Sequence, residues 1–270
     1  MTVRRYFSEA WRGGAGFLSV LYHATVRDIR SAHANAFIAI GSEIAQALVL
    51  VILIMVFLNA LGIGRLMVRG NAMLSVLTGV FLFLVHTRAF SRVIASAAKA
   101  GKMVRHRSTP PVLLHLSAAL ASLYIQTLAL LVMLLATHVL FAPVEVDAAP
   151  RAALAVGLAW FSGLGAGVLA VSLRPYSPKL VQITGSFYAR GNMFFSGKMV
   201  LASGLSASVL QYFLWNPLFH VIDQARAAAF INYTATTTNL LYPFAVGAVC
   251  LLLGLMIGQR SNRILPVTAP

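Results

Sequence analysis

Long apolar stretches separated by short polar ones dominate the chain. Six apolar runs lie at residues 37–58, 72–85, 112–141, 152–173, 183–201 and 240–258. A helix needs about 20 residues to cross a hydrocarbon core of roughly 30 Å, and inside lipid the backbone must satisfy its own hydrogen bonds. The pattern therefore predicts an all-α polytopic membrane protein with six transmembrane helices. The second run is short, and we expect its helix to continue past His86 and Arg88, whereas Arg190 and Lys198 interrupt the fifth.

Two further stretches are neither spans nor simple loops. Residues 15–34 place apolar side chains on one helical face and Arg27 and Arg30 on another, which is typical of a helix lying in the cytoplasmic membrane interface. An ordinary cytoplasmic extension fits the same pattern. Residues 202–239 are too long and too aromatic for a plain loop, yet Asn216-Pro217 prevents a continuous helix. We predict re-entrant helices there, between spans five and six. The apolar face of the first stretch comprises Leu18, Leu21, Tyr22, Thr25 and Ile29.

Composition and charge support a membrane protein. Hydrophobic residues make up 59% of the 270 residues and charged residues 10%, against about 25% charged in soluble domains. The chain has 21 Lys and Arg and 6 Asp and Glu. Most of the basic residues fall in segments 1–36, 86–111, 174–182 and the tail, so the positive-inside rule predicts that both termini are cytoplasmic. Topology thus explains the charge, and we expect no nucleic-acid partner.

The motifs of common enzyme and metal sites are missing from the sequence. It contains no Gly-x-Ser-x-Gly, no His-Glu-x-x-His and no P-loop motif. Its one cysteine, Cys250, excludes a disulfide framework, and Glu43 is the only acidic residue within a predicted span. We therefore expect a protein that is not an enzyme and holds no cofactor or metal. If it transports actively, a partner must supply the energy.

Small and aromatic residues each allow two interpretations. Gly163, Gly165 and Gly167 permit close helix approach, and we favour packing within the chain. Aromatic residues crowd the region around spans five and six, where they fit either an interfacial belt or a surface on which sugar rings stack. They are Tyr188, Phe194, Phe195, Tyr212, Phe213, Trp215 and Phe219.

Residues 214–226 read LWNPLFHVIDQAR. This segment resembles a motif near the end of type-two ABC exporter permeases, most closely those that export capsular polysaccharide in Gram-negative bacteria. In that family an aromatic-Asn-Pro-Leu turn leads into a His-Val-Ile-acidic helix with a following Arg. Residues 190–197 and Arg27-Asp28-Ile29-Arg30 also resemble the family, whereas Ser206 and Lys198 replace its usual proline and apolar residue. The matching positions here are Trp215, Asn216, Pro217, Leu218, His220, Val221, Ile222, Asp223 and Arg226.

The resemblance implies one transmembrane permease domain over residues 1–270, with a cytoplasmic or interfacial helix (1–36), a six-helix bundle (37–258) and a cytoplasmic tail (259–270). It implies a homodimer in the bacterial inner membrane, paired with P-loop ATPase subunits that would bind ATP and Mg²⁺. The cargo would be a lipid-linked, often acidic polysaccharide, with periplasmic and outer-membrane export proteins as further partners. Exporters of O-antigen, teichoic acid or small molecules share this architecture. A secondary transporter, a channel or an accessory scaffold also stays open.

Candidate functional residues fall into three groups. Arg190 would face the transport path and bind carboxylate or phosphate, beside the stacking candidates Tyr188, Phe194, Phe195 and Trp215, although it could instead snorkel to the interface. Asn216-Pro217 should cap a helix on which Asp223 and Arg226 pair at i and i+3. The third group would contact the ATPase, and its charge could also reflect topology alone. It comprises Arg27, Arg30, Lys99, Lys102, Arg105 and Arg107, the last four just before Pro110-Pro111.

Overall fold

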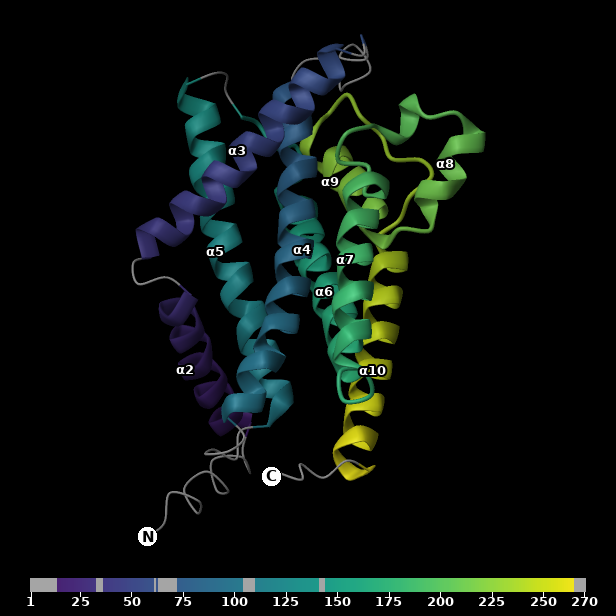
Figure 1. The fold of residues 1–270 in the computed structure, drawn as a ribbon. Coiled ribbons are helices and arrows are strands. Elements are labelled where there is room, and N and C mark those ends of the chain that lie inside the picture. Colours follow the sequence, from purple (N-terminus) through teal and green to yellow (C-terminus); the bar gives the residue numbers. More distant parts are fainter. Residues whose placement is uncertain are drawn as a thin grey trace.

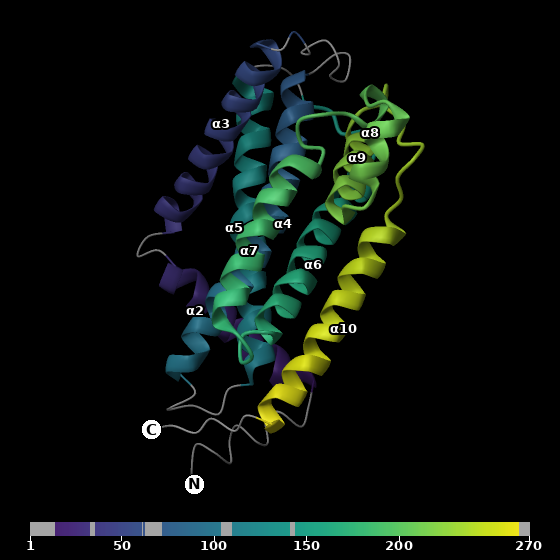
Figure 2. The same ribbon diagram turned by 45° about the vertical axis from the view of Figure 1, so that its right-hand side comes forward.

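A computed structural model describes residues 14–32, 36–60, 62, 72–103, 110–140 and 144–264 of the chain. Within these ranges the fold is all-helical and contains no strand. The long helices pack side by side as an elongated bundle (Figures 1 and 2). The helices are α2 (Gly14–Ala32), α3 (Ala36–Ala60), α4 (Ala72–Met103), α5 (Pro111–Leu140), α6 (Ala149–Ser172), α7 (Pro178–Phe195), α8 (Ala207–Leu214), α9 (Pro217–Ala229) and α10 (Leu241–Ile264), with a short 3₁₀ turn η2 (Ala202–Gly204).

Within the described ranges, five helices are long and apolar enough to cross a membrane, which gives the chain the character of a multi-pass membrane protein. The apolar windows are Ile40–Ala60, Leu74–Ala97, Pro111–Leu140, Ala149–Ser172 and Leu241–Arg260. They match predicted spans one to four and six. The predicted fifth span corresponds to α7, which is shorter and carries Lys179 and Arg190, so it is not among the five. A sixth crossing therefore stays a prediction.

Helix α4 forms the centre of the bundle. It packs along α5 and α6 and also contacts α3 and α9. Its side chains Val76, Leu77 and Val80 are fully buried, whereas most of α3 and α10 is exposed. As expected, α4 runs on past His86 and Arg88, to Met103. Its first half, residues 74–85, is apolar on all sides, which suits such a central position.

Helices α3, α5 and α7 run in one direction along the bundle, and α4, α6 and α10 in the other (Figures 1 and 2). Consequently α9 lies near the ends of α3, α5 and α7 and near the starts of α4 and α6. We call this the α9 end of the bundle. The turn between α6 and α7, the start of α2 and the end of α10 lie at the opposite end (Figure 1).

Short helices fill the stretch between α7 and α10, as the sequence predicted. Helix α7 ends because Gly197 turns the chain with a φ of +72°, a left-handed conformation that favours glycine. Helix α8 has no buried residue, whereas α9 lies between α4 and α6 with most of its side chains buried. Neither helix is long enough to cross a membrane. Their re-entrant placement in the bilayer remains a prediction.

Helix α2 packs on α5 through Leu21 of the predicted apolar face and leaves other residues of that face exposed, so their placement in a membrane interface stays a prediction. Leu21 and Ala24 are buried against Leu113 of α5, whereas Leu18 and Tyr22 of the predicted apolar face are exposed. The Ser117 hydroxyl of α5 donates to Asp28 Oδ2 at 2.7 Å on the packed side. This polar contact lies one turn beyond Ala24. The packed face of α2 therefore includes Asp28, a charged residue that a hydrophobicity pattern would place on the solvent-exposed face.

The glycines of α6 serve packing within the chain, as we favoured. A Cβ on Gly163 would lie 2.4 Å from the His86 carbonyl oxygen of α4, and one on Gly165 would lie 2.3 Å from the Gly247 carbonyl oxygen of α10. Real Cβ atoms do not approach backbone oxygen so closely. Helix α6 therefore meets α4 and α10 at backbone distance, through opposite sides of one glycine-rich segment.

Candidate functional site

The Asn216-Pro217 turn begins α9 in the predicted way. Asn216 is the N-cap, and its Oδ1 accepts the Leu218 N–H at 2.9 Å. Pro217 occupies the first turn, where its missing N–H costs nothing. The amide nitrogen of Asn216 also donates to Asn192 Oδ1 at 3.0 Å. The turn thus caps α9 and attaches it to α7.

Arg226, near the end of α9, is 1% exposed and binds only carbonyl oxygens. Its guanidinium donates to Val200 O at 2.8 Å, Gly197 O and Lys198 O at 2.9 Å, and Ser75 O at 3.3 Å. A planar guanidinium with five donors suits such a cluster of acceptors. Arg226 therefore fixes the turn at residues 197–200 against the start of α4.

Gly79 of α4 makes room for this arrangement. A Cβ there would lie 2.7 Å from Arg226 Nη2 and 2.8 Å from the Lys198 carbonyl oxygen. No sequence pattern indicated this role, because Gly79 stands alone in an apolar run and its partners are more than a hundred residues away.

The predicted ion pair between Asp223 and Arg226 is wrong. Among the described residues the one salt bridge joins Arg88 to Glu43. Asp223 instead accepts hydrogen bonds from the Tyr233 hydroxyl and, at 2.7 Å, from Thr238 Oγ1. Burial, and next the hydrogen bond to Asp223, raise the pKa of the Tyr233 hydroxyl above its ordinary value, so it stays protonated and can donate. The two side chains do not bond to each other because each has a closer set of partners, although the Asp223 carboxylate still favours the charged guanidinium through space.

Other polar side chains of α9 bind the connection to α10. The Asn239 N–H donates to His220 Nδ1 at 3.2 Å, so the proton of the neutral ring is on Nε2, which donates to Leu214 O at 2.9 Å. Gln224 Nε2 donates to Thr238 O at 2.6 Å. His220, Asp223 and Gln224 lie on one helical face, while Arg226 reaches the segment before α8. Helix α9 thus holds both flanking segments in place.

Lys198 is buried in the same region. It is 1% exposed, and its Nζ lies 3.7 Å from the centre of the Phe83 ring, a cation–π contact. Within the described parts of the chain this ammonium has no hydrogen-bond partner, nor do the buried Ser75 and Ser196 hydroxyls. The lysine that departs from the family pattern therefore packs inside the bundle and does not face its surface.

Tyr188 and Arg190 of α7 occupy different faces. Tyr188 packs against Phe90, with ring centres 4.6 Å apart, and its hydroxyl lies 2.8 Å from His86 Nε2. On the other side of the His86 ring, Nδ1 lies 3.0 Å from Ser162 Oγ. Tyr188 therefore joins α7 to α4 and is not available to stack beside Arg190. This buried polar cluster was missed in the sequence, although His86 within an apolar run was a signal for it.

Arg190 lies on the free face of α7. Residues two apart on a helix point about 200° from one another, so Arg190 points away from Tyr188. Its side chain is exposed, and Phe187 and Phe194 on the same face are 70% and 68% exposed. Arg190 has no ion pair with any residue that the structure describes. A positive charge flanked by exposed rings remains on the surface of the single chain.

The other aromatic candidates divide between packing and exposure. Phe195 contacts Phe213 edge to face at 5.6 Å, and Phe213 in turn lies 5.4 Å from the buried Phe219. These rings join α7, α8 and α9. Trp215 is 82% exposed, so its ring is free to meet lipid, cargo or another protein.

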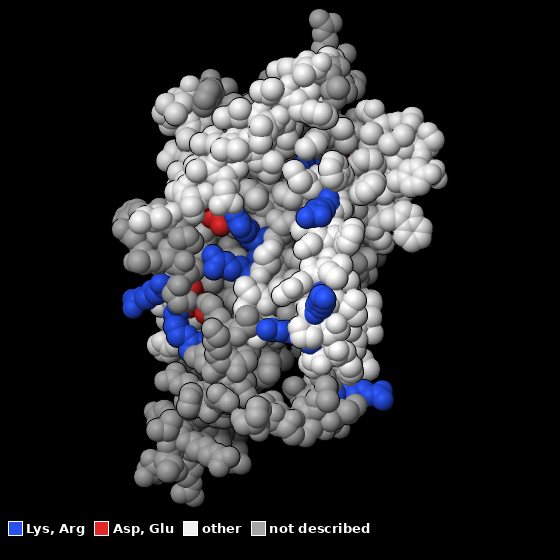
Figure 3. Space-filling model, in the orientation of Figure 1, with Lys and Arg blue, Asp and Glu red and all other residues white. Residues whose placement is uncertain are grey.

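Only some of the basic candidates for ATPase contact lie within the described residues. Arg30 is exposed in the last turn of α2, and Arg27 is half-buried. Lys99 and Lys102 lie on the final turns of α4, whereas Arg105 and Arg107 lie outside the described residues. Figure 3 shows Lys and Arg at mid-height over α2, α4 and α7, with few acidic side chains among them. This face of the chain is basic.

Glu43 and Arg88 are an additional ion pair between α3 and α4. Arg88 Nε donates to Glu43 Oε2 at 3.0 Å, and the same guanidinium bonds to Gln46. Glu43 is 6% exposed, so its carboxylate lies within the bundle. This acid is paired with Arg88 and is not a counter-ion for Arg190.

No protein-family model matches this chain, and no curated protein matches it by sequence. The site must therefore be judged on its chemistry. Over the described ranges no group of three metal-binding side chains occurs. What the geometry offers is an exposed arginine between aromatic rings on α7, beside a rigid α9 unit.

Proposed function

We propose that the chain is the transmembrane subunit of an ATP-driven exporter that moves a lipid-linked, capsular-type polysaccharide across a bacterial inner membrane. The observation that carries this proposal is the free face of α7, where Arg190 projects between Phe187 and Phe194. A guanidinium binds carboxylate or phosphate with paired hydrogen bonds, and aromatic faces stack on sugar rings. An acidic polymer on a lipid phosphate presents both chemistries.

In this proposal α7 is the fifth of six spans in chain order, and both termini are cytoplasmic. It runs beside α4 and α6 (Figures 1 and 2), and its 18 residues give a length of about 27 Å. An arginine at membrane depth costs about 2.5–3.5 kcal/mol on insertion scales and normally faces water or protein. A second copy of the chain, facing α7, would enclose a path that relieves this cost.

The capped and buried α9 supports the resemblance to type-two ABC exporter permeases. The motif residues Asn216, Pro217, His220 and Arg226 each make structural contacts there. In the proposed exporter this unit shapes the end of the path away from the ATPase. The basic ends of α2 and α4 contact the P-loop ATPase, which binds ATP and Mg²⁺.

The test is polymer export by Arg190→Lys, Arg190→Gln and Arg190→Glu, with membrane level and ATPase binding measured in parallel. We expect export to fall in the order Lys, Gln, Glu at equal protein level, because the contact requires positive charge. Arg260→Gln is the matched control, since Arg260 is also exposed. Equal export by all three Arg190 variants would contradict the path contact.

A second experiment tests the class of protein. A P-loop ATPase encoded beside this chain should co-purify with it, and its ATP hydrolysis should respond to the permease. Transport that follows an ion gradient without any ATPase would instead favour a secondary transporter or channel. Export of a polymer with a different lipid anchor would indicate an O-antigen or teichoic-acid exporter.

A further inference from the structure

The groove between α5 and α6 is incompletely filled. Each of these helices packs along α4, but they contact one another little. Near the middle of the groove the Trp160 indole N–H of α6 donates to the Ala119 carbonyl oxygen of α5 at 2.8 Å. Apolar cavities lie on both sides of this bridge, one of about 80 Å³ toward the α9 end and one of about 130 Å³ toward the other end.

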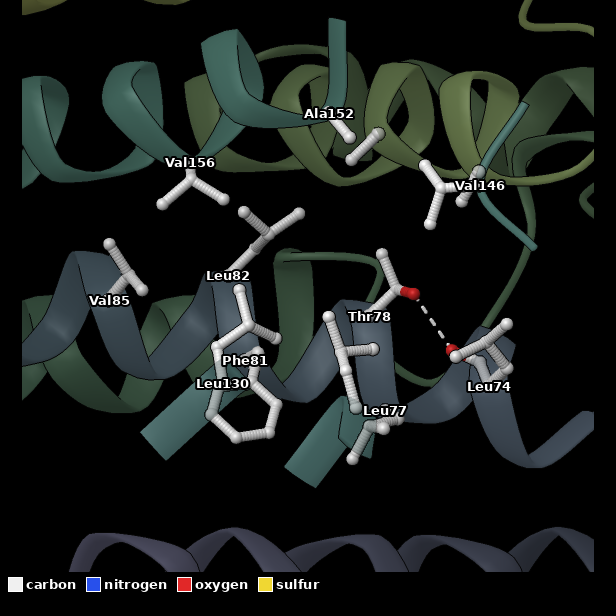
Figure 4. Close-up of a pocket in the computed structure, with 13 residues that line it drawn as sticks. Leu74, Leu77, Thr78, Phe81, Leu82, Val85, Leu130, Val146, Ala152 and Val156 are labelled. Carbon is white, nitrogen blue, oxygen red and sulfur yellow. Dashed lines mark hydrogen bonds between the residues drawn. The ribbon is translucent and has the colours of Figure 1, made fainter. Parts of the chain in front are cut away.

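The cavity toward the α9 end is almost purely apolar (Figure 4). Leu77 and Phe81 of α4 form its floor, and Leu130 of α5 and Val156 of α6 form its sides. The Thr78 hydroxyl also lines it but already donates to Leu74 O at 2.8 Å. The lining therefore offers no free polar group, and an occupant of this cavity must be apolar.

The mouth of this cavity lies in the surface that faces lipid. Val146 at the rim is 37% exposed, and Ala152 and Val156 are half-buried. On either side, Leu131 and Leu135 of α5 and Leu154 of α6 are more than 45% exposed. These side chains belong to windows apolar enough to cross a membrane, where the neighbouring medium is acyl chain.

A polar rim lies directly beyond the cavity. Val146 is flanked by the exposed Glu145 and Asp147, and Ala152 follows the exposed Arg151. The Ala148 N–H donates to Ala228 O of α9 at 2.8 Å, which holds this rim in place. An apolar cavity below, and a rim above that carries one guanidinium and two carboxylates, match a zwitterionic phospholipid, whose phosphate suits the guanidinium and whose ammonium suits the carboxylates.

We propose that this groove is a binding site for one membrane glycerophospholipid, with the end of an acyl chain in the cavity between α5 and α6 and the phosphate at Arg151. The cavity is smaller than the ~150 Å³ engineered cavity that binds benzene, so it accepts the end of a flexible chain. The site is separate from the α7 face and does not depend on the proposed export function.

Trp160 provides a local probe, because it lies one helical turn from Val156. In a chain carrying Trp11→Phe and Trp215→Phe, Trp160 is the only tryptophan left of three. The detergent-solubilised protein is titrated with a phospholipid brominated in its acyl chains, which quenches nearby tryptophan. We expect saturable quenching, with an affinity that falls at least about tenfold in Ala152→Leu, where the added side chain fills the cavity.

Ala153→Leu is the matched control, since Ala153 is the adjacent residue and exposed; its affinity should be unchanged. Arg151→Gln should weaken binding about threefold or more. A detergent brominated in its tail should quench Trp160 without this difference between the Ala152→Leu and Ala153→Leu variants. Equal affinity of Ala152→Leu and Ala153→Leu, or equal quenching by the brominated detergent, would overturn the proposal. If Ala152→Leu does not fold, Ala229→Leu fills the same cavity from α9.

Discussion

Replacing Arg226 by leucine should loosen the turn at residues 197–200. Four carbonyl oxygens accept hydrogen bonds from this guanidinium. The Gly197 oxygen also accepts from the Val200 N–H at 3.3 Å, and the Ser75 oxygen lies within a helix, so these two keep a partner. The carbonyls of Lys198 and Val200 depend most on Arg226.

Leaving a buried acceptor unsatisfied costs about 1–3 kcal/mol for each group. Two such groups, partly offset by the apolar burial of leucine, give a loss of about 3 kcal/mol. That corresponds to about a hundredfold change in the unfolding equilibrium, at 1.4 kcal/mol per factor of ten. The stability of Arg226→Lys should lie between that of the unchanged chain and that of Arg226→Leu, because an ammonium cannot reach all four oxygens at once.

The assay is thermal and chemical unfolding of the detergent-solubilised protein, combined with limited proteolysis at residues 197–205. Arg226→Leu should unfold earlier and be cut faster in this segment, whereas the exposed control Arg260→Leu should behave like the unchanged chain. Wild-type stability and wild-type cleavage in Arg226→Leu would refute the assignment of Arg226 as the residue that holds this turn.

Three further predictions follow from other contacts. A double-mutant cycle of Asp223→Asn and Tyr233→Phe should give a coupling of about 1–2 kcal/mol in unfolding experiments, because the Tyr233 hydroxyl donates to the Asp223 carboxylate; additive losses would contradict this hydrogen bond. Gly79→Ala should lower stability by about 1–3 kcal/mol, because its Cβ overlaps Lys198 and Arg226; an unchanged melting temperature would contradict the close packing. Glu43→Gln should destabilise the solubilised protein more than Glu43→Gln combined with Arg88→Gln, because the single change leaves a half-buried charge unpaired; equal losses would argue against a mutual pair.

Local signals were enough for much of the fold. The apolar runs predicted α3, α5, α6 and α10 because a helix that faces lipid must be apolar along its length. Asn216-Pro217 predicted the start of α9 because capping depends only on neighbouring residues. Helix α7 was harder to predict as a span, because Lys179 and Arg190 lower its hydropathy and because its end depends on a turn at Gly197.

The contacts of charged residues could not be predicted from the sequence. Asp223 and Arg226 have the spacing of a helical ion pair, but acceptors from residues 197–200 and donors from residues 233–238 compete more effectively. Those partners depend on how distant segments pack on α9. Tyr188 similarly has an aromatic neighbour pattern that suited stacking near Arg190, while its true partner His86 lies on another helix. Spacing within one element cannot rank partners from other elements.

The hydrogen bonds of Arg226 also make the chain unevenly tolerant of insertions. One side chain binds the backbone at three of the four positions from Gly197 to Val200, so an added residue there would move oxygens away from a donor that cannot follow. Residues 206–209, at the start of α8, are exposed. An epitope or reporter inserted at residues 206–209 should leave the bundle intact, while the same insertion at residues 197–200 should not. The chain from the end of α7 to the start of α8 therefore contains a site for labelling the protein, a few residues after a turn whose length cannot change.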